Sequence, residues 1–156
     1  MIRNATIRDV KKIHTLLNYF AGKGLLLGRS YSALYDQLRD FKVYVDAEDS
    51  PIGVCALHIV WEDLAEIRSL AVNEEAQGKH VGKELVHACL KEAVMFEIDR
   101  VFTLTYQAGF FRKHGFYDVD KGNLPHKIWS DCINCPKFPD CDEEALEYSV
   151  KQIVQR

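Results

Sequence analysis

The residues best suited to chemistry form one short, glycine-rich and basic segment, Gln77 to Lys83. It lies between an apolar run typical of a strand and an amphipathic helix, so several backbone N–H groups and the positive end of a helix dipole come together. Gly78 and Gly82 let the backbone approach a phosphate closely, and Lys79 and Lys83 add positive charge. The spacing therefore predicts a phosphate-binding turn.

Two well-known phosphate loops do not match this segment. The interval from Gly78 to Gly82 is one residue shorter than in a P-loop, and Glu84 follows Lys83 where a P-loop has Ser or Thr. The dinucleotide fingerprint would need a third glycine. On the loop alone a purely structural interpretation stands equally well, in which Gly78 ends a loop and Gly82 permits close helix packing.

A second candidate is the cluster of Cys132, Cys135 and Cys141, with His126 upstream. These soft ligands suffice for one tetrahedral zinc site, although a second Cys-x2-Cys pair is missing. Such a zinc would be structural, because four protein ligands leave no position open for water. The alternative is three reduced cysteines in a proline-rich tail.

The elements that must position these groups follow from apolar spacing. One helix is capped by Thr6 and stops at Gly22–Gly24, and another is capped by Ser30 with Leu34, Leu38 and Phe41 inward. Short connections favour an antiparallel meander for the next three strands. The further elements expected are strands Lys42–Ala47, Ile52–Trp61 and Leu64–Val72, helix His80–Phe96, strand Arg100–Thr105, helix Gln107–His114 and strand Phe116–Val119.

The resulting fold class is α/β or α+β, a mixed and mostly antiparallel sheet with helices on both faces. An irregular tail rich in Cys and Pro is expected over about residues 123–143, after which Leu146 and Val150 suggest a closing helix or strand. Cys55 and Cys89 lie in apolar patterns, which predicts plain core residues.

Composition limits the partners. The 156 residues, 47% of them hydrophobic, can close one core, so a single domain 1–156 is expected. A net charge of −3 offers no general attraction to nucleic acid or membrane, which favours a small-molecule partner. The absence of a signal-like or bilayer-length apolar run and the odd count of five cysteines predict a cytoplasmic protein. The oligomeric state stays open between a monomer and a homodimer.

Three segments together resemble the signature of the GNAT N-acetyltransferase superfamily: Ala65–Val72, Gln77–Gly82 and Phe110–Phe116. In that family the loop wraps the CoA pyrophosphate, the preceding strand holds the pantetheine and acetyl group through its backbone, and the late helix carries an aromatic pair. The resemblance implies acetyl-CoA as cosubstrate, bound by Leu70, Ala71, Val72, Gln77, Gly78, Lys79, His80, Val81, Gly82, Lys83 and Phe111.

The chain departs from the family pattern at two positions. His80 replaces the first loop glycine, and its N–H would still donate to phosphate in a right-handed turn. Phe111 stands where the family often has a Tyr that protonates the departing thiolate. Either the thiolate leaves unaided, or Tyr106 substitutes as the acid.

A narrower resemblance concerns the substrate. The segments Leu25–Ser30, Arg68–Val72, Leu104–Gln107 and Leu124–Trp129 look like those of the short, kinase-less N-acetylglutamate synthases. This resemblance implies acetylation of the α-amine of glutamate, the first step of arginine biosynthesis.

The resemblance also suggests a mechanism. Glu66 matches the strand position that supplies the base in some members, and desolvation in a cleft would raise the pKa of such a carboxylate. The alternative is that Glu66 is solvated or pairs with Arg68. A splayed strand with a bulge between Leu64 and Val72 would present an N–H near Leu70 or Ala71 to the oxyanion.

An acceptor with carboxylates would be gripped by cationic side chains. Arg29, Arg68 and Lys127 are the candidates, since the arginine fork binds a carboxylate through two hydrogen bonds. Arg29 is preferred because it lies between the first two helices, a loop that borders the acceptor in this family. Two alternatives remain: an acetyltransferase for another small amine or a protein amine, and a non-catalytic regulator that binds CoA or metal.

Overall fold

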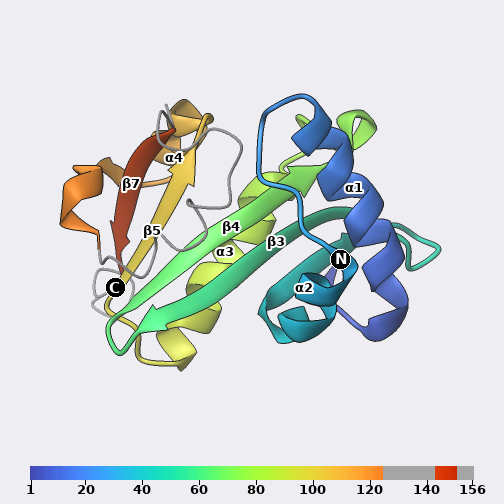
Figure 1. Ribbon diagram of the computed structural model, residues 1–156, viewed down its shortest axis with the longest axis horizontal. Coiled ribbons are helices and arrows are strands. Elements are labelled where there is room, and N and C mark those ends of the chain that lie inside the picture. Colours follow the sequence, from blue (N-terminus) through green and yellow to red (C-terminus); the bar gives the residue numbers. More distant parts are fainter. Residues whose placement is uncertain (125–142, 151–156) are drawn as a thin grey trace.

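The computed structural model describes residues 1–124 and 143–150. These residues contain a seven-stranded sheet in the order β1-β2-β3-β4-β5-β7-β6. Neighbouring strands are antiparallel except for the parallel pair β4 and β5. Helices lie on both faces of the sheet, which confirms the predicted mixed and mostly antiparallel fold (Figure 1).

The helices and strands have the following bounds. The helices are α1 (Val10–Gly22), α2 (Tyr31–Asp36), α3 (Val81–Met95) and α4 (Ala108–Lys113), with short 3-10 turns at Ile7–Asp9, Leu38–Asp40, Glu74–Ala76 and Lys121–Asn123. The strands are β1 (Ile2–Asn4), β2 (Phe41–Val45), β3 (Pro51–Trp61), β4 (Leu64–Val72), β5 (Arg100–Thr105), β6 (Tyr117–Asp118) and β7 (Glu144–Ser149).

The predicted cap Thr6 begins the 3-10 turn Ile7–Asp9, which leads directly into α1, and α1 ends at its predicted glycine stop. The Thr6 N–H donates a hydrogen bond of 2.7 Å to Asp9 Oδ2, which closes the helical entry. At the other end Gly24 N–H bonds Ala21 O at 2.9 Å and Leu25 N–H bonds Phe20 O at 3.1 Å, a Schellman stop. The apolar side chains predicted for the inner face are all buried: Val10, Ile13, Leu17 and Phe20.

The structure corrects one local prediction, adds one strand and decides one element that the sequence left open. Phe41 begins strand β2 and does not close the second helix, because it pairs with Ala56 of β3. Strand β1 was not predicted, since three residues carry too little periodicity to mark an edge strand. The closing element left open between helix and strand is strand β7, which inserts between β5 and β6.

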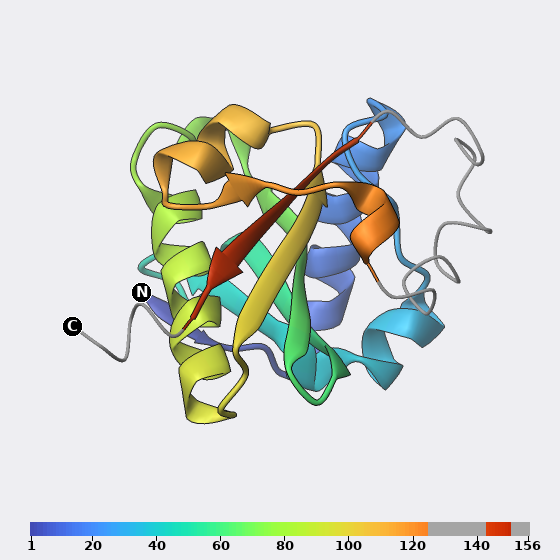
Figure 2. The ribbon, with the colours of Figure 1, turned by 90° about the vertical axis from the view of Figure 1, so that its left-hand side faces the viewer.

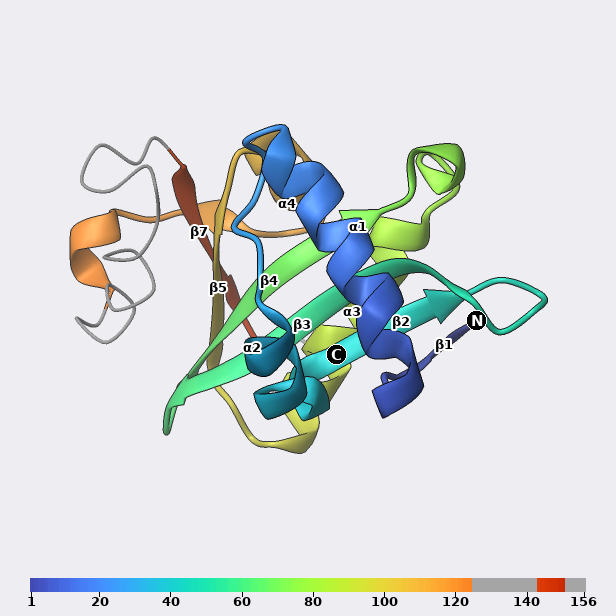
Figure 3. The same ribbon diagram turned by 45° about the vertical axis from the view of Figure 1, so that its right-hand side comes forward.

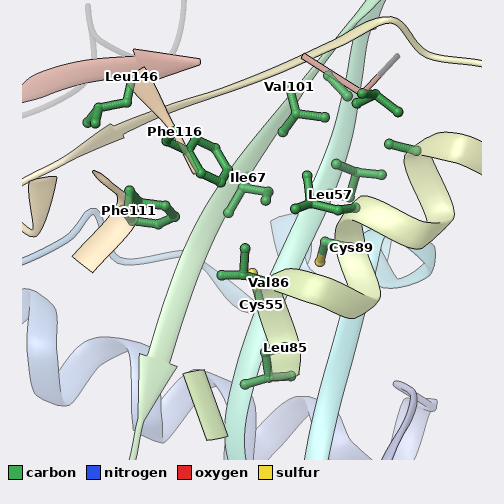
Figure 4. Close-up of a cluster of buried hydrophobic side chains, with 14 of the residues drawn as sticks. Cys55, Leu57, Ile67, Leu85, Val86, Cys89, Val101, Phe111, Phe116 and Leu146 are labelled. Carbon is green, nitrogen blue, oxygen red and sulfur yellow. The ribbon is translucent and has the colours of Figure 1, made fainter. Parts of the chain in front are cut away.

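Figure 2 shows helices on opposite faces of the sheet, and a large cluster of buried apolar side chains lies on each face. Helices α1 and α2 cover one face, and Figure 3 shows α1 lying across strands β3 and β4. Helices α3 and α4 cover the other face, where Leu85, Val86 and Ile67 pack together (Figure 4). Cys55 and Cys89 are fully buried free thiols of this second core, which confirms their predicted role as core residues.

Candidate functional site

A cavity of about 830 Å³ opens at the carboxyl end of β4. Its walls come from four places: the end of α1, the last residues of β4, the loop into α3, and one face of α4. Most of the residues expected to hold acetyl-CoA line it: Leu70, Ala71, Val72, Gln77, Gly78, His80, Val81, Gly82 and Lys83. Lys79 is exposed on the same loop but is not among the lining residues.

The floor of the cavity is the N-terminus of α3. The first hydrogen bond of this helix joins Glu84 N–H to His80 O at 3.0 Å. The N–H groups of Val81, Gly82 and Lys83 therefore have no acceptor inside the helix and point out of its N-terminal end. Together with the dipole of a 15-residue helix, they form a favourable place for a phosphate.

The turn before α3 is strained at His80. Its φ is 66° and its ψ is 11°, so a histidine holds the left-handed conformation that glycine adopts easily. The right-handed turn considered for this residue is not formed. A left-handed backbone at a residue other than glycine costs about 1 kcal/mol, and a glycine at this position would avoid that cost. Gly78 also has positive φ, 82°, so two left-handed residues shape the loop.

Basic side chains surround this end of the cavity. Lys83, Lys113 and His114 line it together with Phe110. Burial lowers the pKa of His114, and the positive charges of Lys83, His87, Lys113 and His80 lower it further. The electrostatic surroundings therefore disfavour one more positive charge and favour an anion.

The acidic lining residue Glu74 is neutralised by its neighbours. Its Oε1 lies 2.7 Å from Lys23 Nζ and also accepts a hydrogen bond from the Tyr19 hydroxyl. These contacts lower the pKa of Glu74, and the bond to Glu74 raises the pKa of Lys23 to about 12. The pair joins the end of α1 to the 3-10 turn that follows β4, and both residues line the cavity.

Strand β4 bends at a bulge beside the cavity. Between Ala71 and Arg68, the two residues Ser69 and Leu70 stand opposite a single residue of β3, and Ser69 has a φ of 56°. This confirms the bulge expected in Leu64–Val72. A bulge re-aims the backbone groups of the strand that carries it.

The other edge of β4 separates from β5. The two strands pair from Leu64 to Glu66 and then diverge (Figure 1). The Thr103 hydroxyl donates to Ile67 O at 2.9 Å, just beyond the last paired residue. Past that point the β5-facing edge of β4 has no neighbouring strand among the described residues, and the Gln77 side chain donates to the Val72 carbonyl there at 3.0 Å. The other backbone groups on that edge can meet a ligand.

A row of polar side chains crosses the α1 face of the sheet near the split. The Glu66 and Arg68 side chains are 13% and 8% exposed, and their nearest charged atoms are 3.6 Å apart. Arg68 also donates to Gln37 Oε1 at 2.9 Å. His58, the cross-strand partner of Glu66, holds Asp40 at 2.6 Å. The alternative in which Glu66 pairs with Arg68 is the arrangement found.

Other predicted site residues lie apart from the cavity lining. Phe111 is 2% exposed and packs against Phe116 in the core. Its neighbour Phe110 faces the cavity in its place. Tyr106 and Arg29 are half-buried, at the end of β5 and between the first two helices. The cavity lining includes neither of them, nor Glu66 nor Arg68.

Several lining residues were missed by the sequence analysis. Phe110, Lys113 and His114 share one helical face at spacings of three and four residues, a signal that could have found them. Lys23 and Glu74 come together over a long sequence separation, which no local pattern indicates.

Some predictions fall outside residues 1–124 and 143–150: Lys127, Cys132, Cys135 and Cys141. Within those two ranges no group of three or more His, Cys, Asp or Glu side chains could hold a metal ion. The helices of the same ranges are too short or too polar to span a membrane.

Residues 15–117 match the model of the acetyltransferase (GNAT) family. An uncharacterized N-acetyltransferase of Chlorobaculum tepidum is 42% identical over 93% of both chains. An amino-acid acetyltransferase of Mycobacterium tuberculosis is 35% identical over 84% of this chain and 76% of its own. The N-acetylglutamate synthase of Neisseria gonorrhoeae, solved with coenzyme A and N-acetyl-glutamate, superposes with a TM-score of 0.87 at 26% identity, over 96% of this chain and 35% of that one.

Proposed function

Since the chain belongs to the acetyltransferase (GNAT) family and is an N-acetyltransferase, we propose that it acetylates the α-amine of an amino acid, with glutamate as the leading candidate. The acetyl donor is acetyl-CoA, as the coenzyme A in the Neisseria gonorrhoeae structure supports. A place in arginine biosynthesis belongs to the same proposal. The observation that carries it is the cavity that joins the α3 N-terminus to the bulged, splayed end of β4.

The cavity fits acetyl-CoA in both charge and shape. Two phosphates of the pyrophosphate would accept hydrogen bonds from the N–H groups of Val81, Gly82 and Lys83, with Lys83 adding charge. The pantetheine arm would run along the β4 edge past Val72, on the side from which β5 has diverged. The thioester would then lie beside the bulge.

The bulge supplies the group that the reaction needs at the acetyl carbonyl. As the amine attacks, negative charge grows on the carbonyl oxygen, and a fixed N–H donor stabilises it. The N–H of Leu70 or Ala71 would be that donor. This donor would stabilise the transition state effectively because the strand geometry fixes its position before the substrate binds.

Proton removal is assigned to Glu66. An aliphatic amine is mostly protonated at neutral pH, so a base must accept its proton before attack. Glu66 lies on β4 at the residue where β4 and β5 part, and its carboxylate is only 13% exposed. Its contact with the Arg68 guanidinium favours the charged carboxylate and so opposes proton uptake. Arg68 would therefore have to exchange Glu66 for another partner during the reaction. An acceptor carboxylate that takes the Arg68 guanidinium would leave Glu66 free to accept the proton.

The acceptor carboxylates would be held by Arg68, with Arg29 and Lys127 as the further cationic groups. Arg68 is oriented already, by the 2.9 Å hydrogen bond to Gln37. Tyr106 is proposed as the acid that protonates the departing thiolate, since Phe111 has no proton to give and lies in the core. The role given earlier to Phe111 at the cofactor passes to Phe110.

The test is a panel of acceptors with acetyl-CoA and a thiol reagent that reports free CoA. The proposal expects rapid CoA release with glutamate and slower release with other amino acids. Release only with a polyamine or a peptide would keep the acetyltransferase and remove the amino acid. Binding of acetyl-CoA without release in the presence of any amine would point to a non-catalytic regulator.

A further inference from the structure

A second group of basic side chains lies beside the loop, where α3 and α4 meet. Lys83 and His87 are four residues apart on α3, and Lys113 and His114 end α4. The ring centroids of His87 and His114 are 6.5 Å apart, and the Phe110 ring lies 4.7 Å from that of His114. Lys83, Lys113, His114 and Phe110 line the cavity, so the group belongs to its wall.

The charges of this group require an explanation. The groups that act on His114 from α3 and its first turn are Lys83, His87 and His80, and Lys113 acts from its own helix. Arg112, the next basic residue, turns away and pairs with Asp118 at 2.9 Å and Glu144 at 3.1 Å. Like charges gathered around one partly buried imidazole destabilise the free protein unless an anion joins them.

We infer that this group, defined by Lys83, His87, Lys113 and His114, binds the 3′-phosphate of CoA. The inference rests on the proposed function and names a recognition site within it. CoA carries three phosphates, and the loop N–H groups account for the two of the pyrophosphate. The remaining phosphomonoester stands on the ribose beside a flat base. The wall beside the loop offers it cationic side chains, with the aromatic ring of Phe110 next to them for the base.

The assignment predicts the direction in which CoA affinity changes with pH. A phosphate dianion favours the charged form of a nearby imidazole, so ligand binding raises the pKa of His114 from its lowered value in the free protein. The complex therefore takes up protons on forming, and the contribution of the 3′-phosphate to affinity grows as pH falls through the histidine range. This gain in affinity stops near pH 6, because the phosphate monoester itself takes up a proton there and loses its second negative charge.

The experiment compares CoA with 3′-dephospho-CoA, which differ by this one phosphate. Calorimetry at pH 6.5 should show CoA binding about tenfold more tightly than 3′-dephospho-CoA, because one charge-assisted contact is gained. At pH 8.5 the preference for CoA should fall to about threefold. The double variant Lys113→Gln, His114→Gln should bind both nucleotides alike. The matched control Lys11→Gln, His14→Gln, on α1, should keep the preference.

The outcomes separate this inference from the proposed function. Equal affinity of the two nucleotides for the unmodified protein at both pH values overturns the inference and leaves the acetyl-CoA site intact. A preference that survives in the Lys113→Gln, His114→Gln variant also overturns it. Affinity of that variant for dephospho-CoA reports its folding. Failure of both nucleotides to bind the unmodified protein would instead contradict the proposed function.

Discussion

A bulky side chain at Gly82 should remove acetyl-CoA binding while leaving the fold intact. Gly82 is the second residue of α3, and its surroundings set the size limit. A Cβ added there would lie 3.5 Å from Phe110 Cζ and 3.8 Å from Val72 Cγ2, which is ordinary van der Waals contact. Alanine therefore fits, whereas a large side chain at this cavity-lining position would compete with the pyrophosphate for space.

The expected magnitudes differ between the two substitutions. Gly82→Ala should stabilise the helix by up to about 1 kcal/mol, because glycine is a poor helix former. Gly82→Trp should raise the Kd for acetyl-CoA by at least about a hundredfold, or about 2.7 kcal/mol, since the ring displaces the phosphate from its N–H donors.

Isothermal titration calorimetry measures the Kd, and thermal unfolding verifies the fold. The matched control is Gly109→Trp, because Gly109 is also the second residue of a helix and an added Cβ there meets nothing within 4 Å. That variant should bind normally. Unchanged affinity in Gly82→Trp would show that the loop does not hold the pyrophosphate.

Three further predictions concern proton removal, acceptor binding and stability. Glu66→Gln should lower kcat by roughly a hundredfold or more with partial recovery at higher pH, and a loss that does not recover as pH rises would assign Glu66 a structural role. Arg29→Ala should mainly raise KM for the acceptor, measured by initial rates, and weakened acetyl-CoA binding would contradict this. Burial opposes the charge of Asp9, but hydrogen bonds from Arg3 at 2.7 and 3.0 Å lower the pKa of Asp9 overall. The stability that Asp9 adds to the fold is therefore present above the pKa of the unfolded state and is lost as pH falls through the pKa of the folded state. Asp9→Asn should therefore cost about 2 kcal/mol in the free energy of unfolding at pH 7 and little at low pH, as denaturant titration would show; an equal cost at both would refute the linkage.

Much of the fold could be predicted from local patterns. Strands β4 and β5 and helix α1 follow from apolar spacing and end signals, because burial on one face dictates their period. Phe41 was misplaced because an apolar residue after a helix suits either element, and the strand partner Ala56 decides it. Strand β1 forms by pairing with β2, and three residues are too few to show a strand pattern in the sequence.

The site was predictable where one segment carries it. The loop and the bulge of β4 were expected, whereas the left-handed His80 was not, because its strain is imposed by the turn and not by residue type. The choice between Phe110 and Phe111 depends on which side of α4 meets the core, and two adjacent aromatic residues leave that ambiguous. Partners such as Lys23 and Glu74 meet only after folding.

Acetyl transfer to an amino-acid amine is tested most directly by following the label from acetyl-CoA carrying a 13C acetyl group. In the presence of glutamate and the protein, NMR should show the label leave the thioester and appear on the α-nitrogen of N-acetylglutamate, at a rate proportional to protein concentration. Label that stays on CoA, or that emerges only as free acetate with every amino acid offered, would contradict the account.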